Sequence, residues 1–182
     1  MNIIDLYCGL GGWAKGLIDA GHRITGYDIV DFSKEYPGSF VQCDLLTYSK
    51  FPEQIDVIVA SPPCTEFSKA SFPKSWTSVK KYPLDIDKGL KLFNRVYEIM
   101  QFVNHKYFII ENVRGAQKFV GKAREHKGSR YLWGNYPDFE LYGTDTDIYG
   151  KSKSHNPAIR SIIPYSISRG FGEKLKNDLA KY

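Results

Sequence analysis

The stretch Asp5-Leu6-Tyr7-Cys8-Gly9-Leu10-Gly11-Gly12 decides the fold of this chain. It continues an apolar, strand-like run over Ile3–Tyr7 and leads into Trp13–Ala20, which has the apolar spacing of a helix. Glycines between a strand and a helix permit a tight turn and let a ligand approach bare backbone. The stretch therefore predicts a βα unit with a nucleotide-type binding turn, although such glycines also occur merely to pack a helix on a sheet.

Other apolar runs continue this alternation of strands and helices. The further strands that we expect are Arg23–Tyr27, Asp56–Ala60 and Tyr107–Glu111. A helix is expected over Ile86–Asn104, with Leu90, Phe93, Tyr97 and Met100 on one face. This order is typical of an α/β protein with a mostly parallel sheet and helices on both faces. At 182 residues the chain fits a single domain over residues 1–182.

Three later segments differ in composition from these strands and helices. Ser68–Pro83 is rich in Ser, Lys and Pro and predicts a long loop, either a binding loop or a surface excursion. Lys118–Arg130 is basic and is expected to be a helix end and loop on a solvated face. Ile163–Lys181 is expected to be a closing helix, with Pro164 near its first turn.

Composition narrows the class of protein. The chain is 42% hydrophobic and 25% charged, which is typical of a globular protein. No apolar run approaches the roughly 20 residues that cross a bilayer, and no signal peptide is evident at Met1, so we expect a cytoplasmic location without membrane contact. A net charge of +5 makes a polyanionic partner plausible. Cys8, Cys43 and Cys64 show no metal-like spacing, so no metal is expected.

Asp28 stands at the end of the second apolar run, about 20 residues beyond the glycine-rich turn. An acidic side chain in this position accepts hydrogen bonds from ribose hydroxyls. Both dinucleotides and adenosyl cofactors carry such hydroxyls, so Asp28 leaves the choice of cofactor open.

Cys64 lies in Ser61-Pro62-Pro63-Cys64-Thr65-Glu66-Phe67-Ser68, directly after the run Asp56–Ala60. Open α/β sheets bind ligands at the carboxyl ends of their parallel strands, which is where this pattern predicts Cys64 to be. A lone cysteine is more often an inert buried residue than a nucleophile. The position of Cys64 and the two rigid prolines before it make a role as nucleophile about as plausible as an inert, buried role.

Glu111-Asn112-Val113 follows the most apolar run, Tyr107–Ile110. The pattern predicts a carboxyl group at the same sheet edge as Cys64, one strand away. With an apolar approach, such a carboxyl group is expected to have a raised pKa and to share a proton with a substrate. In isolation, a helix-capping acid is an equal alternative.

Together these segments resemble the cytosine carbon-5 DNA methyltransferase family. Asp5–Gly12 resembles its first motif, Pro62-Pro63-Cys64-x-x-Phe67-Ser68 its Pro-Cys motif, and Glu111-Asn112-Val113 its ENV tripeptide. The resemblance implies a Rossmann-like class I S-adenosylmethionine-dependent methyltransferase. It also implies Cys64 as nucleophile, Glu111 as its partner on the base, and Arg130 as a further catalytic residue. The cofactor-binding residues it implies are Tyr7, Gly9, Leu10, Gly11, Asp28, Ile29, Asp44, Leu45 and Pro63.

The resemblance also raises the question of how a target is recognised, because no region resembles the family's target-recognition domain. Ser68–Pro83 and Tyr136–Pro157 could read DNA modestly and in a salt-dependent way. A separate recognition subunit or a homodimer could supply specificity, or the substrate could be RNA or a free cytosine nucleotide. A role in restriction-modification is left open. A Rossmann-type dehydrogenase leaves Cys64 and Glu111 unexplained, and a non-catalytic DNA-binding subunit would need neither.

Overall fold

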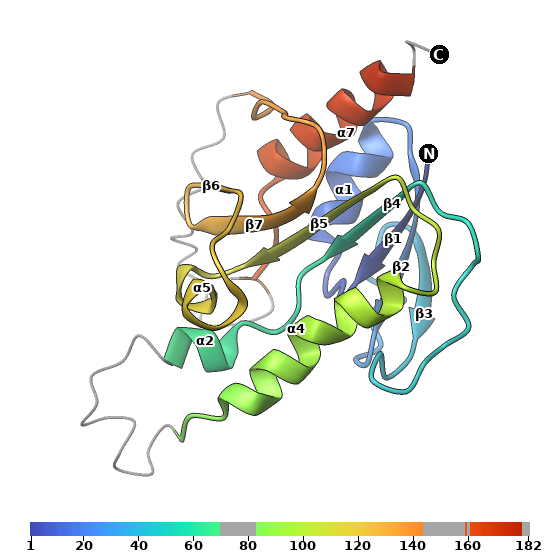
Figure 1. The fold of residues 1–182 in the computed structure, drawn as a ribbon. Coiled ribbons are helices and arrows are strands. Elements are labelled where there is room, and N and C mark those ends of the chain that lie inside the picture. The colour runs from blue at the N-terminus through green and yellow to red at the C-terminus, as the bar shows by residue number, and fades with distance from the viewer. Residues whose placement is uncertain (70–82, 144–158, 160, 180–182) are drawn as a thin grey trace.

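The computed structural model describes residues 1–69, 83–143, 159 and 161–179. Its described strands form one sheet in the order β3-β2-β1-β4-β5-β7-β6 (Figure 1). The strands are β1 (Asn2–Leu6), β2 (Arg23–Asp28), β3 (Ser39–Gln42), β4 (Val57–Ala60), β5 (Tyr107–Asn112), β6 (Glu125–Lys127) and β7 (Arg130–Asn135). The helices are α1 (Gly12–Asp19), α2 (Thr65–Lys69), α4 (Ile86–Met100), the 3-10 helix η1 (Arg114–Ala116), α5 (Gln117–Val120) and α7 (Tyr165–Leu179).

The sheet confirms the predicted mostly parallel α/β fold. Strands β3, β2, β1, β4 and β5 are parallel, whereas β7 runs antiparallel to β5 and to β6. The chain builds outward from β1 toward β3 and then from β4 toward β7, so the strand order reverses between β1 and β4. Such a switch point leaves a crevice at the carboxyl ends of the two strands, where open α/β sheets bind ligands.

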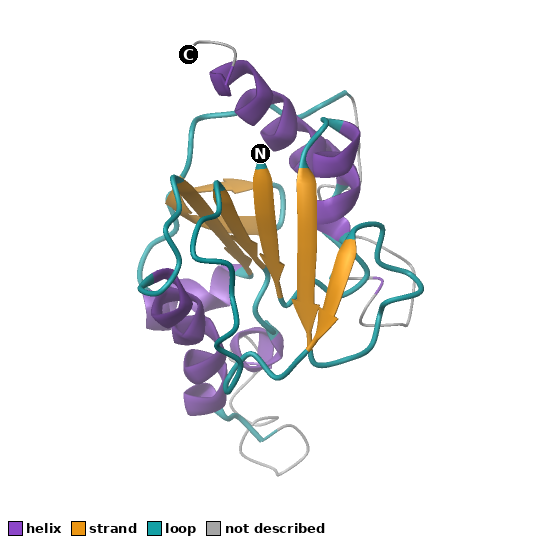
Figure 2. Cartoon of the chain, turned by 90° about the vertical axis from the view of Figure 1, so that its right-hand side faces the viewer, coloured by secondary structure: helices purple, strands orange, loops and turns teal. Residues whose placement is uncertain are grey.

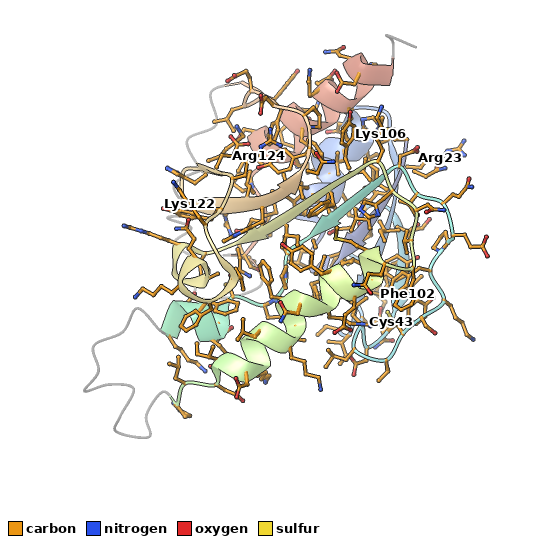
Figure 3. All side chains as sticks on the ribbon, in the orientation of Figure 1. Arg23, Cys43, Phe102, Lys106, Lys122 and Arg124 are labelled. Atoms are coloured by element: carbon orange, nitrogen blue, oxygen red, sulfur yellow. The ribbon has the colours of Figure 1, made fainter. Side chains whose placement is uncertain are left out.

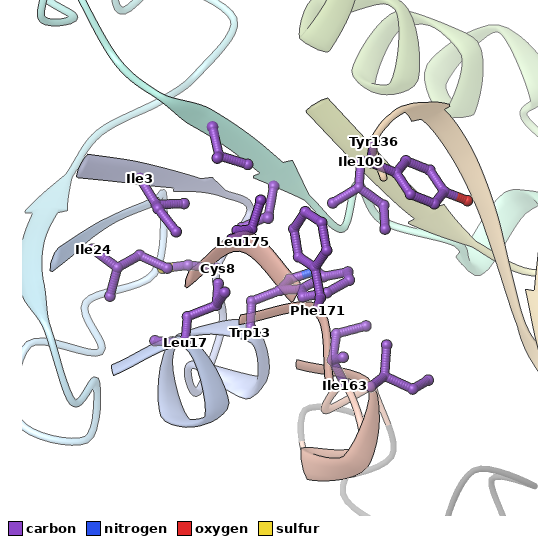
Figure 4. Packing of buried hydrophobic residues seen from close by; sticks show 14 of the residues in the cluster. Ile3, Cys8, Trp13, Leu17, Ile24, Ile109, Tyr136, Ile163, Phe171 and Leu175 are labelled. Atoms are coloured by element: carbon purple, nitrogen blue, oxygen red, sulfur yellow. The ribbon is translucent and has the colours of Figure 1, made fainter. Parts of the chain in front are cut away.

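Helices α1 and α7 cover one face of the sheet (Figure 2). Trp13 and Leu17 of α1 pack with Phe171 and Leu175 of α7 in one buried cluster, as Figure 4 shows. The Nε2 atom of His22 lies 2.8 Å from the carbonyl oxygen of Gly172 and ties α7 to the turn after α1. The predicted closing helix over Ile163–Lys181 is therefore present, with slightly narrower bounds, as a core element.

Helices α2 and α4 cover the opposite face. Their buried side chains include Phe67 of α2 and Phe93, Val96 and Ile99 of α4. The predicted buried face of α4 is partly wrong, because Tyr97 is 38% exposed. The buried residues of α4 that face the sheet, Phe93, Val96 and Ile99, are three residues apart. Tyr97 therefore lies beside this row, toward the solvent side of the helix.

Several predicted boundaries are also wrong. The segment Lys118–Arg130 contains the end of α5, the strand β6 and the first residue of β7, because pairing with β5 organises it as a hairpin. The helix predicted to reach Asn104 ends at Met100. Ser68 lies in α2, so the predicted loop begins later, and its residues 70–82 lie outside the described residues, as do residues 144–157 of the predicted Tyr136–Pro157 segment. Within the described part of the chain, no helix has the length and apolar character that spanning a membrane requires.

Candidate active site

The strand register brings the predicted catalytic groups to one edge of the sheet. Leu6 of β1 pairs with Ala60 of β4, and Ala60 pairs with Ile110 of β5. Ser61 directly follows β4, and Glu111 is the residue of β5 that follows Ile110. Both residues therefore lie at the same level of the sheet, beside the switch point. Cys64 follows three residues after Ser61 and immediately precedes α2.

Two hydrogen bonds hold the segment around Cys64. The side-chain amide of Asn112, which is fully buried, donates to the carbonyl oxygen of Pro62 at 2.8 Å. The indole Nε1–H of Trp13 donates to the hydroxyl oxygen of Ser61 at 3.1 Å. The first bond connects the ends of β4 and β5, and the second connects β4 to the helix of the glycine-rich turn.

The Ser61 side chain also lies near the carboxylate of Glu111 and acts to lower its pKa. The Ser61 oxygen accepts from Trp13, which leaves the hydroxyl proton available to Glu111. The glycine-rich turn and the candidate catalytic acid are therefore linked through two side chains. Sequence reasoning missed Ser61 and Trp13, since Ser61 precedes the Pro-Cys motif and Trp13 reads as an ordinary core residue.

Arg130 reaches the same carboxylate from the antiparallel strand. Tyr131 of β7 pairs with Asn112 of β5, which brings Arg130 beside the end of β5. Its Nη1 atom lies 3.4 Å from Oε1 of Glu111, and both side chains are largely buried. Its Nη2 donates to the carbonyl oxygen of Ile162 at 3.0 Å, just before α7. The structure therefore brings Cys64, Glu111 and Arg130 together at one site.

Burial raises the pKa of Glu111, while Arg130 and the Ser61 hydroxyl oppose that shift. Burial also raises the pKa of Cys64, and the carboxylate of Glu111 raises it further. The Ser68 side chain and Arg130 act in the opposite direction on Cys64. Two anions at adjacent strand ends disfavour each other, so the site favours one negative charge over two.

The other two cysteines lack these opposing side chains. Burial raises the pKa of Cys8, with Asp5 and Asp28 adding to the rise. Burial also raises the pKa of Cys43 to about 11, again with nearby carboxylates adding to it. Cys64 thus differs from Cys8 and Cys43 in having side chains, those of Ser68 and Arg130, that act to lower its pKa against the rise caused by burial and Glu111.

The backbone of the glycine-rich turn is open at Gly9, whereas a Cβ atom added at Gly11 would meet Pro37 at 2.5 Å. Gly9 adopts a φ of +50°, and a Cβ atom added there would meet nothing within 4 Å. Gly11 has a φ of +80° and precedes the first residue of α1. Tyr7 has a φ of +57° and donates its hydroxyl to the carbonyl oxygen of Leu92. Leu10 is half-buried between the two glycines.

Asp28 closes the turn from the end of β2. Its Oδ2 accepts the backbone N–H of Gly9 at 3.0 Å, and its Oδ1 accepts that of Val30 at 3.0 Å. A carboxylate offers about four lone-pair sites, so capacity for a further hydrogen bond remains. The neighbouring Ile29 is 62% exposed and presents an apolar surface beside the carboxylate.

The remaining predicted cofactor residues lie at the ends of β3 and β4. Asp44 is exposed, and its Oδ1 accepts the backbone N–H of Leu46 at 2.9 Å. The Leu45 side chain is buried in the core, so only its backbone is available to a ligand. Pro63 is exposed beside Cys64. Arg95 of α4, which sequence reasoning also missed, holds this loop by donating to the carbonyl oxygens of Leu45 and Tyr48.

No group of three or more potential metal ligands occurs among the residues that the structure describes. The site at the switch point is formed by backbone, carboxylates, a thiol and an arginine. This sheet, with its glycine-rich turn, defines the class I methyltransferase fold. In agreement with it, the methyltransferase EhMeth of Entamoeba histolytica superimposes with a TM-score of 0.51 at 16% identity, covering 79% of this chain and 55% of that one.

The particular family follows from the sequence. The chain belongs to the C-5 cytosine-specific DNA methylase family, whose profile matches residues 1–127. This confirms the resemblance drawn from the motifs. The match includes Cys64 and Glu111 but ends before Arg130.

Two relatives show how far the similarity extends. One relative is a Methanocaldococcus jannaschii protein that is provisionally named a type II methyltransferase. It is 31% identical over 140 residues, and the match covers 62% of this chain and 41% of that protein. A frog virus 3 protein named as a probable DNA (cytosine-5)-methyltransferase is 32% identical over 117 residues, covering 62% of this chain and 53% of that protein. The chain thus spans about half the length of these relatives or less.

Proposed function

We propose that this protein transfers a methyl group from S-adenosylmethionine to carbon-5 of cytosine in DNA. The observation that carries the proposal is the juxtaposition of Cys64 and Glu111 at neighbouring strand ends, with Arg130 at 3.4 Å from the carboxylate. Membership of the C-5 cytosine-specific DNA methylase family supports the same reaction and substrate. A dehydrogenase would leave Cys64 and Glu111 without a role.

The residues at the glycine-rich turn fit an adenosyl cofactor. The open backbone at Gly9 leaves room for a ligand above the turn. Asp28 would accept hydrogen bonds from the ribose hydroxyls, and the exposed Ile29 would contact the adenine ring. Asp44 would accept from the adenine amine. When bound, S-adenosylmethionine supplies an electrophilic methyl group.

In the proposed reaction, Cys64 first loses its proton to solvent and its thiolate adds to carbon-6 of the cytosine. As the sulfur–carbon bond forms, Glu111 donates a proton to ring nitrogen 3, and carbon-5 gains nucleophilic electron density. Carbon-5 would then take the methyl group as its bond to the cofactor's sulfur breaks, leaving S-adenosylhomocysteine. Loss of the carbon-5 proton to a base lets the thiolate leave, and nitrogen 3 returns its proton to Glu111, which regenerates the enzyme.

Arg130 and Ser61 would stabilise the charge that Glu111 acquires in this sequence. When Glu111 gives up its proton, its carboxylate faces the guanidinium of Arg130 and the hydroxyl of Ser61. Donors that are already oriented toward a developing charge need little reorganisation during the reaction. Asn112 would position the Cys64 segment through its hydrogen bond to Pro62.

Carbon-5 of a paired cytosine is hidden in the duplex, so the base must leave the stack, at a cost of a few kcal/mol. We expect affinity for DNA to be modest and strongly salt-dependent, given the net charge of +5. A separate recognition subunit or a homodimer stays a prediction for the source of specificity. The same site would also act on cytosine in RNA or in a free nucleotide, which the experiment below distinguishes.

The test is incubation with isotopically labelled S-adenosylmethionine and, in parallel, duplex DNA, RNA or dCMP, followed by nucleoside analysis. We expect label in 5-methylcytosine from DNA. Cys64→Ser should abolish the transfer, whereas Cys43→Ser, a matched thiol-to-hydroxyl control away from the proposed chemistry, should keep it. Label in another base, or in RNA or dCMP but not DNA, would contradict the proposed substrate.

A further inference from the structure

A basic segment follows β5, the strand that bears Glu111, and leads into β6. Residues 114–122 contain three cations, Arg114, Lys118 and Lys122, and no acidic residue. All three cations are exposed. We call these nine residues the Arg114–Lys122 surface.

These cations differ from others nearby in having no ion pair with any residue that the structure describes. Beyond the surface, Arg124 pairs with Asp138 and Lys127 pairs with Glu125. The nearby acids are therefore already engaged by other cations. Among the described residues, the three cations of the Arg114–Lys122 surface therefore have no ion-pair partner.

The surface is anchored to the catalytic edge. Phe119 of α5 stacks on Phe67 of α2, with ring centroids 5.8 Å apart, and α2 begins directly after Cys64. At its other end, the indole of Trp133 donates to the carbonyl oxygen of Gly121 at 3.0 Å. Figure 1 likewise has α5 and α2 side by side at the tip of β5. The cations thus lie on a packed element beside both Cys64 and Glu111.

Resting on the proposed function, we propose that the Arg114–Lys122 surface binds the phosphate backbone of DNA beside the target cytosine. Exposed cations fit phosphates, and such contacts position a protein without reading sequence. Anchoring to α2 and β7 fixes the cations relative to the reacting groups. A strand held there would carry its phosphates past the site at which Cys64 meets the base.

The test is the salt dependence of binding to a short cytosine-containing duplex, measured by fluorescence anisotropy for the whole chain with S-adenosylhomocysteine present. The slope of log K against log salt changes by about 0.9 for each phosphate that a cation neutralises. Lys118→Gln with Lys122→Gln should therefore reduce the slope by about 1.8. Between about 50 and 200 mM salt, wild type should lose about 12-fold more affinity than this double variant.

The matched control is Arg23→Gln with Lys106→Gln, which removes the same charge from the opposite edge of the sheet. Arg23 begins β2 and Lys106 precedes β5, whereas the catalytic groups follow the carboxyl ends of the strands. Figure 3 shows both residues far from Lys122. The control slope should stay close to that of wild type, and thermal melting should show that both double variants are folded.

Two results would overturn the inference alone: methylation of DNA by wild type with no change of slope in the Lys118 and Lys122 variant, or equal changes in the variant and the control. The second result would show an effect of net charge without a local surface. If wild type neither binds nor methylates DNA, the proposed function fails, and the inference fails with it.

Discussion

Replacing Arg130 by methionine should destabilise the fold in a way that depends on pH. The substitution keeps an apolar stem but removes the cation 3.4 Å from Glu111, whose side chain is 7% exposed. A buried carboxylate that loses its cation either stays charged at high cost or takes up a proton. Protonation of Glu111 costs less free energy than keeping it charged. Its cost therefore sets an upper limit on the stability that is lost through Glu111.

The limit follows from the ordinary pKa of a glutamate, about 4.5. Holding Glu111 neutral costs about 1.36 kcal/mol for each pH unit above that value, hence at most about 3.4 kcal/mol at pH 7 and about 0.7 kcal/mol at pH 5. Burial already raises the pKa of Glu111 in wild type, so the difference between the proteins is smaller than this limit. The lost hydrogen bond to Ile162 adds about 1.5–3 kcal/mol at both pH values.

The sign follows from proton linkage. In the variant, the folded pKa of Glu111 rises further above its unfolded value, so the folded state binds the proton more tightly. The added destabilisation is therefore absent below about pH 4.5, grows as the pH rises, and levels off above the folded pKa of the variant.

Urea denaturation of wild type and variant at pH 5 and pH 7 measures this difference. The control is Glu98→Gln, which breaks an ion pair of 2.8 Å whose glutamate is 58% exposed. Although that pair is shorter, its loss should cost less than about 1 kcal/mol at either pH. A destabilisation by Arg130→Met that is equal at both pH values, or larger at pH 5, would refute the reasoning.

Three further predictions concern the proposed chemistry. Cys64→Ser should bind S-adenosylmethionine in calorimetry yet fail to form the covalent complex that wild type forms with DNA containing 5-fluorocytosine; an adduct that peptide mapping assigns to Cys43 would contradict the mechanism. Glu111→Gln should lower the pKa of Cys64, because the carboxylate raises it, and so speed its alkylation by iodoacetamide at neutral pH; unchanged or slower alkylation, followed by mass spectrometry, would argue against the coupling. Asp28→Ala should weaken S-adenosylmethionine binding by about 1.5–3 kcal/mol for each charge-assisted hydrogen bond removed, and tight binding of NAD would overturn the cofactor assignment.

The central strands could be predicted because they consist mostly of apolar residues, which indicates that they are buried. β1, β4 and β5 are mostly apolar and largely buried, as a parallel sheet covered by helices requires. The edge strands β3 and β6 could not be predicted from the sequence. β3 has only partly buried or exposed residues, and β6 reads Glu125-His126-Lys127, so neighbouring strands, not apolar composition, define both elements.

Some residues of the candidate site could likewise be predicted from the sequence, and others could not. Cys64 and Glu111 could be proposed from the sequence because each follows an apolar run that predicts a parallel strand, and the family motifs pair them. The roles of Ser61 and Arg95 could not, because each depends on a partner far along the chain. Trp13 meets Ser61 across 48 residues, and Arg95 reaches Leu45 across 50.

The raised pKa of Cys64 would look unfavourable for a nucleophile if that residue were considered alone. Glu111 changes the argument, because its carboxylate is one cause of that rise and burial favours its neutral form. In the proposed reaction the site carries one negative charge throughout: on sulfur before addition, and on Glu111 once nitrogen 3 has taken its proton. Arg130 acts on both positions, since it lowers the pKa of each group. A guanidinium that stabilises the charge at either position lets the charge move from Cys64 to Glu111 without a second ionisation.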